Sequence, residues 1–466
     1  MNTVHRQILQ QLPNGPSLPP ILQLANWIAR PYPFLDDCAR LYGDRFTLRL
    51  SSFSPMVFFS HPDTIQEIFR ADPNHFEIGA TNGILRPLVG NESLLLLDGD
   101  RHQRQRQLLM PPFHGERMRA YGDLIRDITQ QVTDKWQIGQ PFAVRPFMQD
   151  ISLKVILQAI FGTDRGEHYE QLRQLTSTLL DLTGSPLSSS ILFIHQLQRD
   201  WGTWSPWGKF INLRSRVDDI IYREIHYRRE HFDPNREDIL TLLLSARDEN
   251  GQPMTDIELR DELMTLLLAG HETTASALTW ALYWIHHLPT VHDSLLAELS
   301  SIDPDDISAL VRSPYLNAVC QETLRIYPIA PIPFPRRVLE NPFEVRGESY
   351  PPETMLIPCI YLTHHRPDVY PNPQQFRPER FLERQYSPYE FLPFGGGNRR
   401  CIGMAFALYE MKLVLAEILS NFELILERDR PVQPVRRGVT LAPPATLKLV
   451  VSRSRQATKF PVASHM

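Results

Sequence analysis

The sequence feature that most constrains this chain is a glycine-rich stretch with one cysteine, FGGGNRRCIG, from Phe394 to Gly403. Its glycines have no Cβ and adopt positive φ at little cost, so the backbone can lie flat against a large planar molecule. The next segment, 405–416, is apolar and rich in helix formers, which places Cys401 near a helix N-terminus. Amide groups and the helix dipole at that position favour a thiolate. The stretch therefore predicts a loop that presents an anionic sulfur to a flat cofactor.

A haem iron bound by the sulfur of Cys401 is the interpretation that fits this loop best. A thiolate on one face of the iron donates electron density and favours O–O cleavage when oxygen binds on the other face. The alternatives are a cysteine in an ordinary glycine loop and one ligand of a zinc site. Zinc would require a second Cys or His at short spacing, and this loop contains none.

The composition is that of a globular protein. Hydrophobic residues make up 42% of the chain and charged residues 22%, which excludes a disordered or collagen-like protein. A net charge of −5 gives no reason to expect nucleic acid as a partner. The four cysteines, Cys38, Cys320, Cys359 and Cys401, lack paired spacing, so we expect a reducing, intracellular setting.

The N-terminal region lacks both the run of about 20 apolar residues of a spanning helix and a signal-peptide pattern. We therefore expect a soluble, cytoplasmic protein. A short apolar patch from Leu18 to Leu24, with Trp27 and Ile28, is interrupted by prolines. Such a patch either rests on a membrane surface or packs on its own domain, and the sequence leaves both open.

The hydrophobic pattern predicts a mainly α fold with minor β. Residues 45–50 alternate polar and apolar and are followed, after a polar turn, by the apolar run 56–59, which predicts two strands and a small β-rich N-terminal region. Helical periodicity then dominates over 64–71, 118–136, 151–161, 169–182, 212–232 and 239–246. We find no internal repeat or linker, so we expect a single domain over 1–466, with 1–30 as an N-terminal extension and 451–466 as a C-terminal tail.

The longest predicted helix has polar and small residues in its middle. A capping-box pattern, Thr255 to Glu258, starts it and Pro289 ends it, a span of about 30 residues and about 45 Å. Its centre, AGHETT at 269–274, interrupts an apolar run. A glycine inside a helix costs up to about 1 kcal/mol relative to alanine, so Gly270 needs a reason.

Thr273 and Glu272 give that helix a chemical interpretation. A threonine hydroxyl that bonds back to a carbonyl one turn earlier can open the helix and leave room for a small ligand. Glu272 beside Thr273 then resembles a proton-delivery pair, in which the acid relays protons from solvent. The alternative is a kink with a buried, satisfied threonine and a surface glutamate, and the motif alone does not decide between them.

Glu322 and Arg325 lie at i and i+3 on a helix predicted for 315–327, so they share one face and can pair. On an exposed helix the pair would contribute well under about 1 kcal/mol. Apolar neighbours suggest instead that the helix is packed. We then expect a buried structural clamp, completed by Arg380 of the Pro378–Phe381 segment.

Taken together and in this order, the cysteine loop, Glu322-x-x-Arg325, Pro378-Glu379-Arg380-Phe381 and the AGHETT centre resemble the cytochrome P450 family, from about Pro33 to Val450. The resemblance implies the cytochrome P450 fold, in which the long helix lies over a non-covalently bound haem b (iron protoporphyrin IX) and Cys401 is the metal ligand. It implies a monooxygenase, which inserts one atom of O2 into an apolar substrate with electrons from a separate partner.

The resemblance also implies roles for individual residues. The haem propionates would be held by Arg399, Arg337 and Arg106, together with His102, which stands where the family often has tryptophan. Glu272 stands where many members have aspartate, a variation that relay chemistry tolerates. Phe394, Gly395, Gly403, Ala269 and Gly270 would lie against the haem. The substrate pocket would be lined by Leu85, Leu88, Leu266, Ala269, Ala330, Ile332, Val439 and Leu441.

Such an apolar lining favours a long-chain fatty acid or a terpenoid as the hydroxylated substrate, and Arg86 is a candidate to bind a carboxylate. The alternatives are a haem-thiolate peroxygenase or isomerase and a non-catalytic haem sensor, neither of which needs the Glu272 and Thr273 pair. Electrons would come from a ferredoxin or flavodoxin with its reductase, docked on a basic patch of Arg101, Arg104, Arg400 and Lys412. We expect a monomer.

Overall fold

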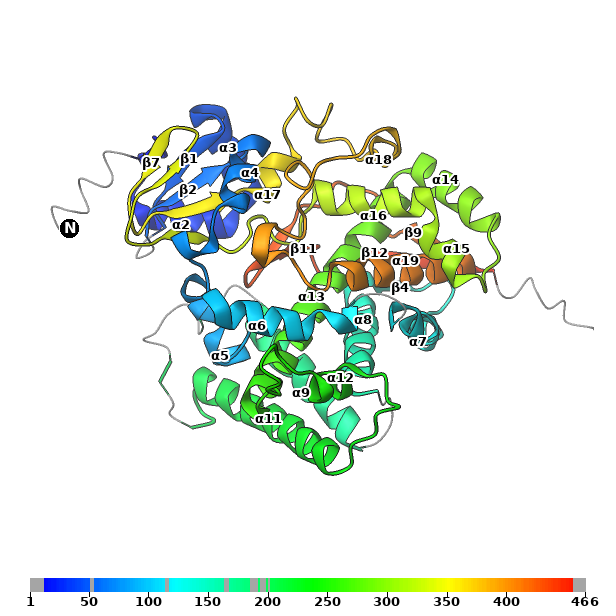
Figure 1. Cartoon of the computed structure of the whole chain (residues 1–466). Coiled ribbons are helices and arrows are strands. Elements are labelled where there is room, and N and C mark those ends of the chain that lie inside the picture. Colours follow the sequence, from blue (N-terminus) through cyan, green and yellow to red (C-terminus); the bar gives the residue numbers. More distant parts are fainter. Residues whose placement is uncertain are drawn as a thin grey trace, which may run out of the picture.

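The computed structural model describes residues 12–50, 54–113, 117–162, 167–184, 192, 198–199 and 202–455 (Figure 1). Residues 1–11 of the predicted N-terminal extension and 456–466 of the predicted C-terminal tail lie outside the described residues. The prediction of a mainly α protein with minor β is confirmed.

Helices form most of the chain. Their bounds are α2 Pro20–Ala29, α3 Pro31–Tyr42, α4 Pro62–Arg70, α5 Arg86–Val89, α6 Gly99–Leu109, α7 Arg117–Thr133, α8 Val144–Phe161, α9 Glu167–Gly184, α11 Pro206–Glu230, α12 Ile239–Ser245, α13 Asp256–His287, α14 Pro289–Ser300, α15 Ile307–Arg312, α16 Pro314–Ile326, α17 Ile360–His364, α18 Arg380–Glu383 and α19 Met404–Asn421. All six helices predicted between 64 and 246 are present. Helix α8 begins at Val144 rather than at 151, because a proline such as Pro146 is tolerated in a first turn.

Helix α13 begins and ends where its sequence predicts. Thr255 and Glu258 form the capping box, and the helix ends at His287, before Pro289. Its 32 residues correspond to about 48 Å at 1.5 Å per residue. In Figure 1 it runs through the middle of the molecule, where it packs against α8, α11, α16 and α19.

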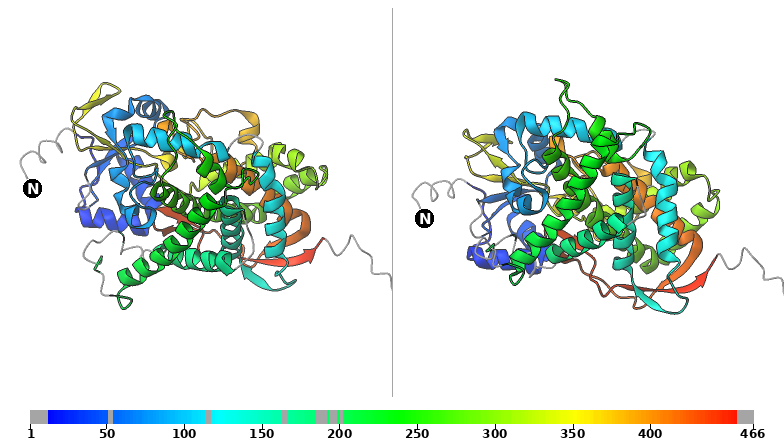
Figure 2. Two further views of the ribbon diagram at one scale, coloured as in Figure 1. Left: turned by 60° about the horizontal axis from the view of Figure 1, so that its bottom comes forward. Right: turned by 90° about the horizontal axis from the view of Figure 1, so that it is seen from below.

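The sheet predicted near the N-terminus is built from both halves of the chain. Strands β1 (Arg45–Leu48) and β2 (Met56–Phe59) form the expected antiparallel hairpin. The sheet continues through β8 (Met355–Pro358), β5 (Arg336–Val338) and β3 (Phe76–Glu77), in the order β1-β2-β8-β5-β3. All four residues of β2 are buried, so this strand needs a second neighbour, and β8 supplies it in parallel. The views in Figure 2 show these blue and yellow strands at one edge of the molecule.

Three smaller sheets complete the β structure of the described residues. Strand β12 (Lys448–Ser454) lies between β4 (Pro141–Ala143) and β9 (Phe422–Leu426). Strands β6 (Phe343–Val345) and β7 (Glu348–Tyr350) form one hairpin, and β10 (Val435–Arg437) and β11 (Thr440–Ala442) form another. The second hairpin carries two of the predicted pocket residues, Val439 and Leu441.

The apolar N-terminal patch lies on α2 and on the residues just before it, partly exposed and partly packed inward. Pro20 starts this helix at its first position, where its missing N–H costs nothing. Leu18, Ile21, Leu22 and Ile28 are exposed, while Leu24 and Trp27 pack against the neighbouring apolar cluster. Within the described ranges, no helix is long and apolar enough to cross a membrane.

Candidate active site

The loop before α19 has the shape that its glycines predict. Gly395 and Gly397 have φ of +69° and +65°, in the left-handed region, and the amide of Cys401 donates to the carbonyl of Phe394 at 3.0 Å. A Cβ at Gly396 would lie 2.4 Å from the ring of Phe69. Side chains at these positions would strain the backbone or collide with α4, so the loop requires glycine.

Cys401 differs from the other three cysteines. Its side chain is solvent-accessible, whereas Cys38, Cys320 and Cys359 are buried. Although the residue is accessible, desolvation by the protein around its sulfur raises the pKa of Cys401, while a hydrogen bond from the amide of Gly403 and the charge of Arg106 oppose that rise. A thiol in these surroundings stays protonated unless a cation binds it, and coordination to a metal is the usual means. The site therefore fits a sulfur that becomes a thiolate on binding iron.

Four basic side chains gather beside this loop. Arg336 is fully buried, and burial with the nearby charge of Arg399 lowers its pKa to about 9. Burial, Arg399 and Arg106 lower the pKa of His102 to about 3. Among the described residues, Nη1 of Arg336 and Nε of Arg399 have no hydrogen-bond partner. Asp98, 2.5 Å from Arg399, is an acid that pairs with the cluster. A cluster with several arginines, one acid and unused N–H donors suits an anionic ligand, such as the two propionates of a haem.

The structure places Arg336, not Arg337, in this cluster. Arg336 donates to the carbonyl of Gly396 at 3.3 Å. Arg337 points to the other side of β5, where it pairs with Glu77 and, at 3.4 Å, with Glu353. The expectation that Arg337 holds a haem propionate stays a prediction, and Arg336 is the candidate that lies in the basic cluster. Successive side chains of a strand alternate between faces, and only the sheet shows which face meets the loop.

The centre of α13 combines a back-bonded threonine with a close helix contact. The hydroxyl of Thr273 donates to the carbonyl of Ala269 at 2.6 Å, as expected. Gly270 also has a packing role: a Cβ there would come within 3.2 Å of Ile156 of α8, and its carbonyl accepts from Ser152 at 3.2 Å. Ala269 is solvent-accessible, whereas Leu266, three residues earlier, is buried.

Glu272 is only partly accessible and contacts three side chains. It pairs with Arg145 of α8, accepts from Gln149 at 3.0 Å and lies 3.3 Å from Nε of Arg437 of β10. Arg145 is buried. These partners are far away in sequence and carry no motif, so no local pattern could identify them.

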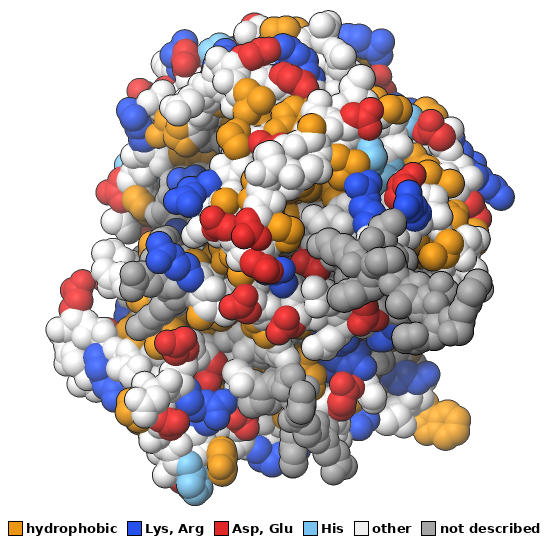
Figure 3. All heavy atoms as spheres, turned by 90° about the vertical axis from the view of Figure 1, so that its right-hand side faces the viewer, with side chains coloured by type: hydrophobic (Ala, Val, Ile, Leu, Met, Phe, Trp, Pro, Cys, Tyr) orange, Lys and Arg blue, Asp and Glu red, His pale blue; other side chains and the backbone are white. Residues whose placement is uncertain are grey.

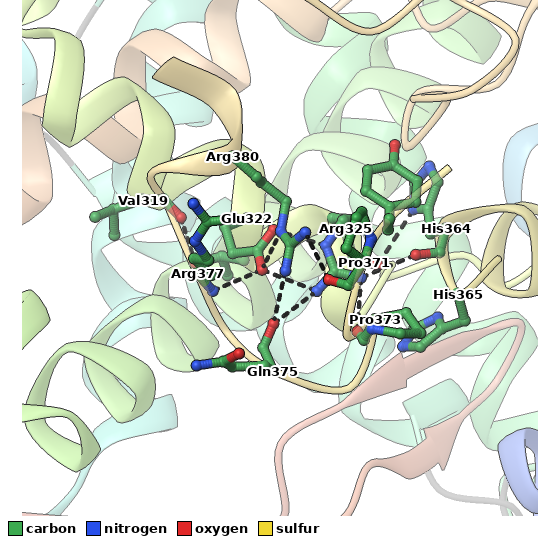
Figure 4. Close-up of polar contacts among 12 residues, drawn as sticks. Val319, Glu322, Arg325, His364, His365, Pro371, Pro373, Gln375, Arg377 and Arg380 are labelled. Carbon is green, nitrogen blue, oxygen red and sulfur yellow. Dashed lines mark hydrogen bonds and ion pairs between the residues drawn. The ribbon is translucent and has the colours of Figure 1, made fainter. Parts of the chain in front are cut away.

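The predicted clamp is present and completely buried (Figure 4). Glu322 accepts from Nε of Arg325 at 2.6 Å and from Nη2 at 2.8 Å. It also accepts from Nε of Arg380 at 3.1 Å and from the amide of Arg377 at 2.8 Å. The remaining donors of Arg325 go to the carbonyls of His364, Pro373 and Gln375. One carboxylate thus ties α16 to the segment that leads into α18.

The predicted pocket residues fall into separate groups. Leu85, Leu88 and Leu266 share the largest apolar core, whereas Ile332 and Leu441 belong to the cluster around β1 and β2. Ala330 is partly buried and Val439 is 50% exposed at the hairpin turn. Arg86 is exposed at the start of α5. The apolar character holds, and the side chains are distributed over more than one apolar cluster.

The basic patch expected for a redox partner is largely neutralised within the chain. Arg101 pairs with Glu92, Arg104 with Asp248 and Glu258 at 2.6 Å each, and Lys412 donates to a backbone carbonyl of α15. Arg400 is exposed. On the face that carries α14 and α15, acidic side chains gather near the centre and basic ones lie scattered (Figure 3).

The sequence analysis did not identify two buried acids. Burial raises the pKa of Glu410 of α19 to about 8, and one of its oxygens has no hydrogen-bond partner in the part of the chain that the structure describes. Burial likewise raises the pKa of Glu262 of α13, which accepts from the amide of Leu94 at 2.8 Å. Each lies on the apolar side of its helix, and this position in the sequence pattern could have indicated a buried acid.

Comparisons with known proteins agree with this geometry. The family model described as cytochrome P450 matches residues 13–451. The chain is 36% identical to cytochrome P450 135B1 of Mycobacterium tuberculosis over 96% of this chain and 93% of that protein. It is 34% identical to cytochrome P450 135A1 of the same species, over 95% and 96% respectively.

Solved structures show the same fold. Retinoic acid-bound cyanobacterial CYP120A1 superposes with a TM-score of 0.80 at 25% identity, over 95% of this chain and 100% of that one. The haem domain of cytochrome P450DA gives 0.81 at 23% identity, over 97% and 98%. The expected haem b cofactor and oxidoreductase class are confirmed at the level of the family. The chain therefore belongs to the cytochrome P450 family of haem-thiolate monooxygenases.

Proposed function

We propose that this cytochrome P450 hydroxylates a long, apolar carboxylic acid or terpenoid. The reaction takes one substrate molecule, O2, two electrons and two protons, and gives the alcohol and water. The observation that carries the proposal is the retinoic acid bound to CYP120A1, because retinoic acid is both a terpenoid and a carboxylic acid. The uniformly apolar side chains predicted for the pocket suit such a molecule.

Cys401 and the basic cluster would hold the cofactor. We assign the sulfur of Cys401 as the ligand of the iron. The propionate carboxylates of the haem would be held by His102, Arg106, Arg336 and Arg399. When bound, the haem supplies the iron at which O2 is reduced. Charged hydrogen bonds from arginine to carboxylate are strong, and the unpartnered nitrogens of Arg336 and Arg399 are available for them.

Glu272 and Thr273 would supply protons. The hydroxyl of Thr273 is held by the carbonyl of Ala269, which fixes its oxygen at the accessible side of α13. Glu272 directly precedes Thr273 on the same turn and is partly accessible, so it can take a proton from water. A carboxylate next to a hydroxyl in the centre of a long helix is an arrangement that moves protons inward.

A spectral binding titration of the holoenzyme tests the substrate class. Retinoic acid and palmitic acid should shift the haem absorption to shorter wavelength, and glucose should not. Product analysis with a surrogate reductase should then show one added oxygen atom. No shift with either acid would contradict the proposed class. Loss of the red-shifted band of the reduced, CO-treated protein in Cys401→Ala would support the ligand assignment, and its persistence would refute it.

Electron supply comes from a separate partner in this family, and we propose a ferredoxin or flavodoxin with its reductase. The paired state of Arg101 and Arg104 argues for a smaller electrostatic contribution to docking than four free cations would give. Reduction rates with both carriers, measured between low and high salt, test this. A steep fall with salt would show that free surface charge controls docking after all.

Peripheral membrane contact through α2 is a second part of the proposal. Leu18, Ile21, Leu22 and Ile28 expose apolar surface on one short segment. Ile21→Glu with Leu22→Glu should reduce sedimentation of the protein with phosphatidylcholine vesicles. Leu41→Glu is the control, because Leu41 is 68% exposed on α3, outside the segment. Equal sedimentation of the double variant and the control would exclude this contact.

A further inference from the structure

The N-terminal part of α13 carries four buried polar side chains, Arg260, Asp261, Glu262 and Thr265. A buried polar group is costly unless it has a hydrogen-bond partner. All four have partners on residues 89–94, at the end of α5 and the start of the segment that leads to α6. Because the other buried side chains of this part of α13 are apolar, the four indicate a specific contact with that segment.

Asp261 shapes residues 90–98, the strap between α5 and α6. Its Oδ2 accepts from the amide of Glu92 at 2.8 Å. Gly90, at the start of the strap, has a φ of +92°, and a Cβ there would lie 2.1 Å from the carboxylate of Asp261. Position 90 therefore requires glycine both for its positive φ and for the space that the acid occupies. The strap is built around this side chain.

Glu262 and Thr265 bind the next two residues of the strap. Oε1 of Glu262 accepts from the amide of Leu94 at 2.8 Å, and the hydroxyl oxygens of Thr265 and Ser93 are 2.6 Å apart. Burial raises the pKa of Glu262 well above its usual value, which favours the neutral acid. Asp261, Glu262 and Thr265 thus form a latch that holds three successive residues of the strap.

The other end of the strap binds Arg399 of the cysteine loop. Nη1 of Arg399 donates to the carbonyl of Leu94 at 3.1 Å, and Nη2 donates to the carbonyl of Leu97. Asp98, the last residue of the strap, pairs with the same guanidinium. Leu94 is therefore held on both sides, by Glu262 at its amide and by Arg399 at its carbonyl. A movement of the strap at this residue moves the acceptor that fixes the guanidinium.

We propose that the latch residues Asp261, Glu262 and Thr265 are positioning residues for the haem, which act by fixing the strap and, through Leu94, the guanidinium of Arg399. The inference rests on the proposed role of Arg399 as a ligand of a haem propionate. An arginine that is already held in place loses less side-chain freedom when it binds a carboxylate. Without the latch the guanidinium is free to move, and the holoenzyme loses its haem faster.

Haem transfer from the holoenzyme to apomyoglobin, together with hydrogen exchange of the strap amides, tests the inference. Thr265→Val removes the hydroxyl that contacts Ser93 and keeps a similar volume. The amides of residues 92–95 should then exchange about fivefold faster or more, and haem transfer should accelerate by a similar factor. Glu262→Leu should have the same effects. Glu262→Gln keeps a carbonyl acceptor for Leu94, so both rates should stay within about twofold of the wild type.

Thr279→Val is the matched control on the same helix. The hydroxyls of Thr265 and Thr279 each donate to the carbonyl one turn earlier at 2.7 Å, and both threonines are buried. Only Thr265 of the two also bonds to the strap among the described residues. Thr279→Val should therefore leave haem transfer and the exchange of the strap amides near their wild-type rates.

Thermal unfolding of each variant checks the fold, and if Glu262→Leu does not fold, Thr265→Val and Glu262→Gln carry the test. Unchanged haem transfer in Thr265→Val, or an equal change in Thr279→Val, would overturn the inference. Equal haem transfer from Glu262→Gln and Glu262→Leu would also overturn it, since glutamine preserves the bond to Leu94. Haem transfer from Arg399→Gln at the wild-type rate would instead refute the role of Arg399 itself.

Discussion

The backbone amide of Leu392 donates a hydrogen bond of 3.0 Å to Nε2 of His364. The other nitrogen of this ring lies 3.2 Å from the carbonyl of Arg325. Burial and the charge of Arg325 hold the pKa of His364 well below its usual range, so the ring is neutral and can accept from Leu392. Because Leu392 leads directly into the cysteine loop, one neutral histidine connects the buried clamp to the proposed iron ligand.

Removing the charge of Glu322 should destabilise the protein strongly. Glu322→Gln leaves Arg325 and Arg380 buried without a counter-charge, and breaking a buried ion pair in this way typically costs about 3–5 kcal/mol. Thermal unfolding followed by circular dichroism measures the loss. Glu383→Gln is the control, because its pair with Arg377 is half exposed and should contribute less than about 1 kcal/mol. Similar effects of the two substitutions would contradict the clamp.

Arg336 and Arg337 should differ in haem retention. Arg336→Gln removes a charged hydrogen bond to the cofactor and should raise the rate of haem transfer to apomyoglobin by roughly tenfold or more. Arg337→Gln should leave that rate near the wild-type value, because Arg337 pairs with Glu77 and Glu353 on the other side of the strand. Faster haem transfer from Arg337→Gln than from Arg336→Gln would instead support the sequence-based assignment of Arg337 to a haem propionate.

Thr273→Ala should separate electron consumption from product formation. The substitution removes the hydroxyl that passes protons inward, so less product should form for each reductant molecule consumed. The ratio of product formed to reductant consumed is measured with retinoic acid or palmitic acid, whichever shifts the haem absorption. Thr279→Ala provides a matched control on the same helix, since its hydroxyl also bonds back one turn, at 2.7 Å, but is buried. An unchanged ratio in Thr273→Ala would show that this hydroxyl has no role in proton delivery.

Glu410 should make stability depend on pH. Its pKa is raised from 4.5 to about 8, so the folded protein holds a proton that the unfolded chain releases. Stability from this group is complete below about pH 4.5 and falls as pH rises toward about 8, by a few kcal/mol at most. Glu410→Gln should therefore gain stability relative to the wild type between about pH 5 and pH 8. The free energy of unfolding of both proteins is measured with denaturant as a function of pH. If the two curves are parallel, Glu410 does not carry a proton in the folded protein.

Patterns with short sequence spacing were predictable. The capping box of α13, the back-bond of Thr273 to Ala269 and the pair of Glu322 with Arg325 all lie within four residues, where the helix alone sets the distance. The glycines of the cysteine loop were predictable for the same reason, because positive φ is a local requirement. From these features the sequence by itself determined the family, the cofactor and the long helix.

Tertiary structure alone decided the partners that lie far apart in the chain. Whether Arg336 or Arg337 meets the loop depends on which face of β5 the sheet turns inward, and β5 pairs with strands from both halves of the chain. Arg145 and Arg437 reach Glu272 only because α8 and the β10–β11 hairpin pack beside α13. Local spacing fixes which side chains share a helix face. Packing of distant segments, which no local pattern encodes, fixes what that face meets.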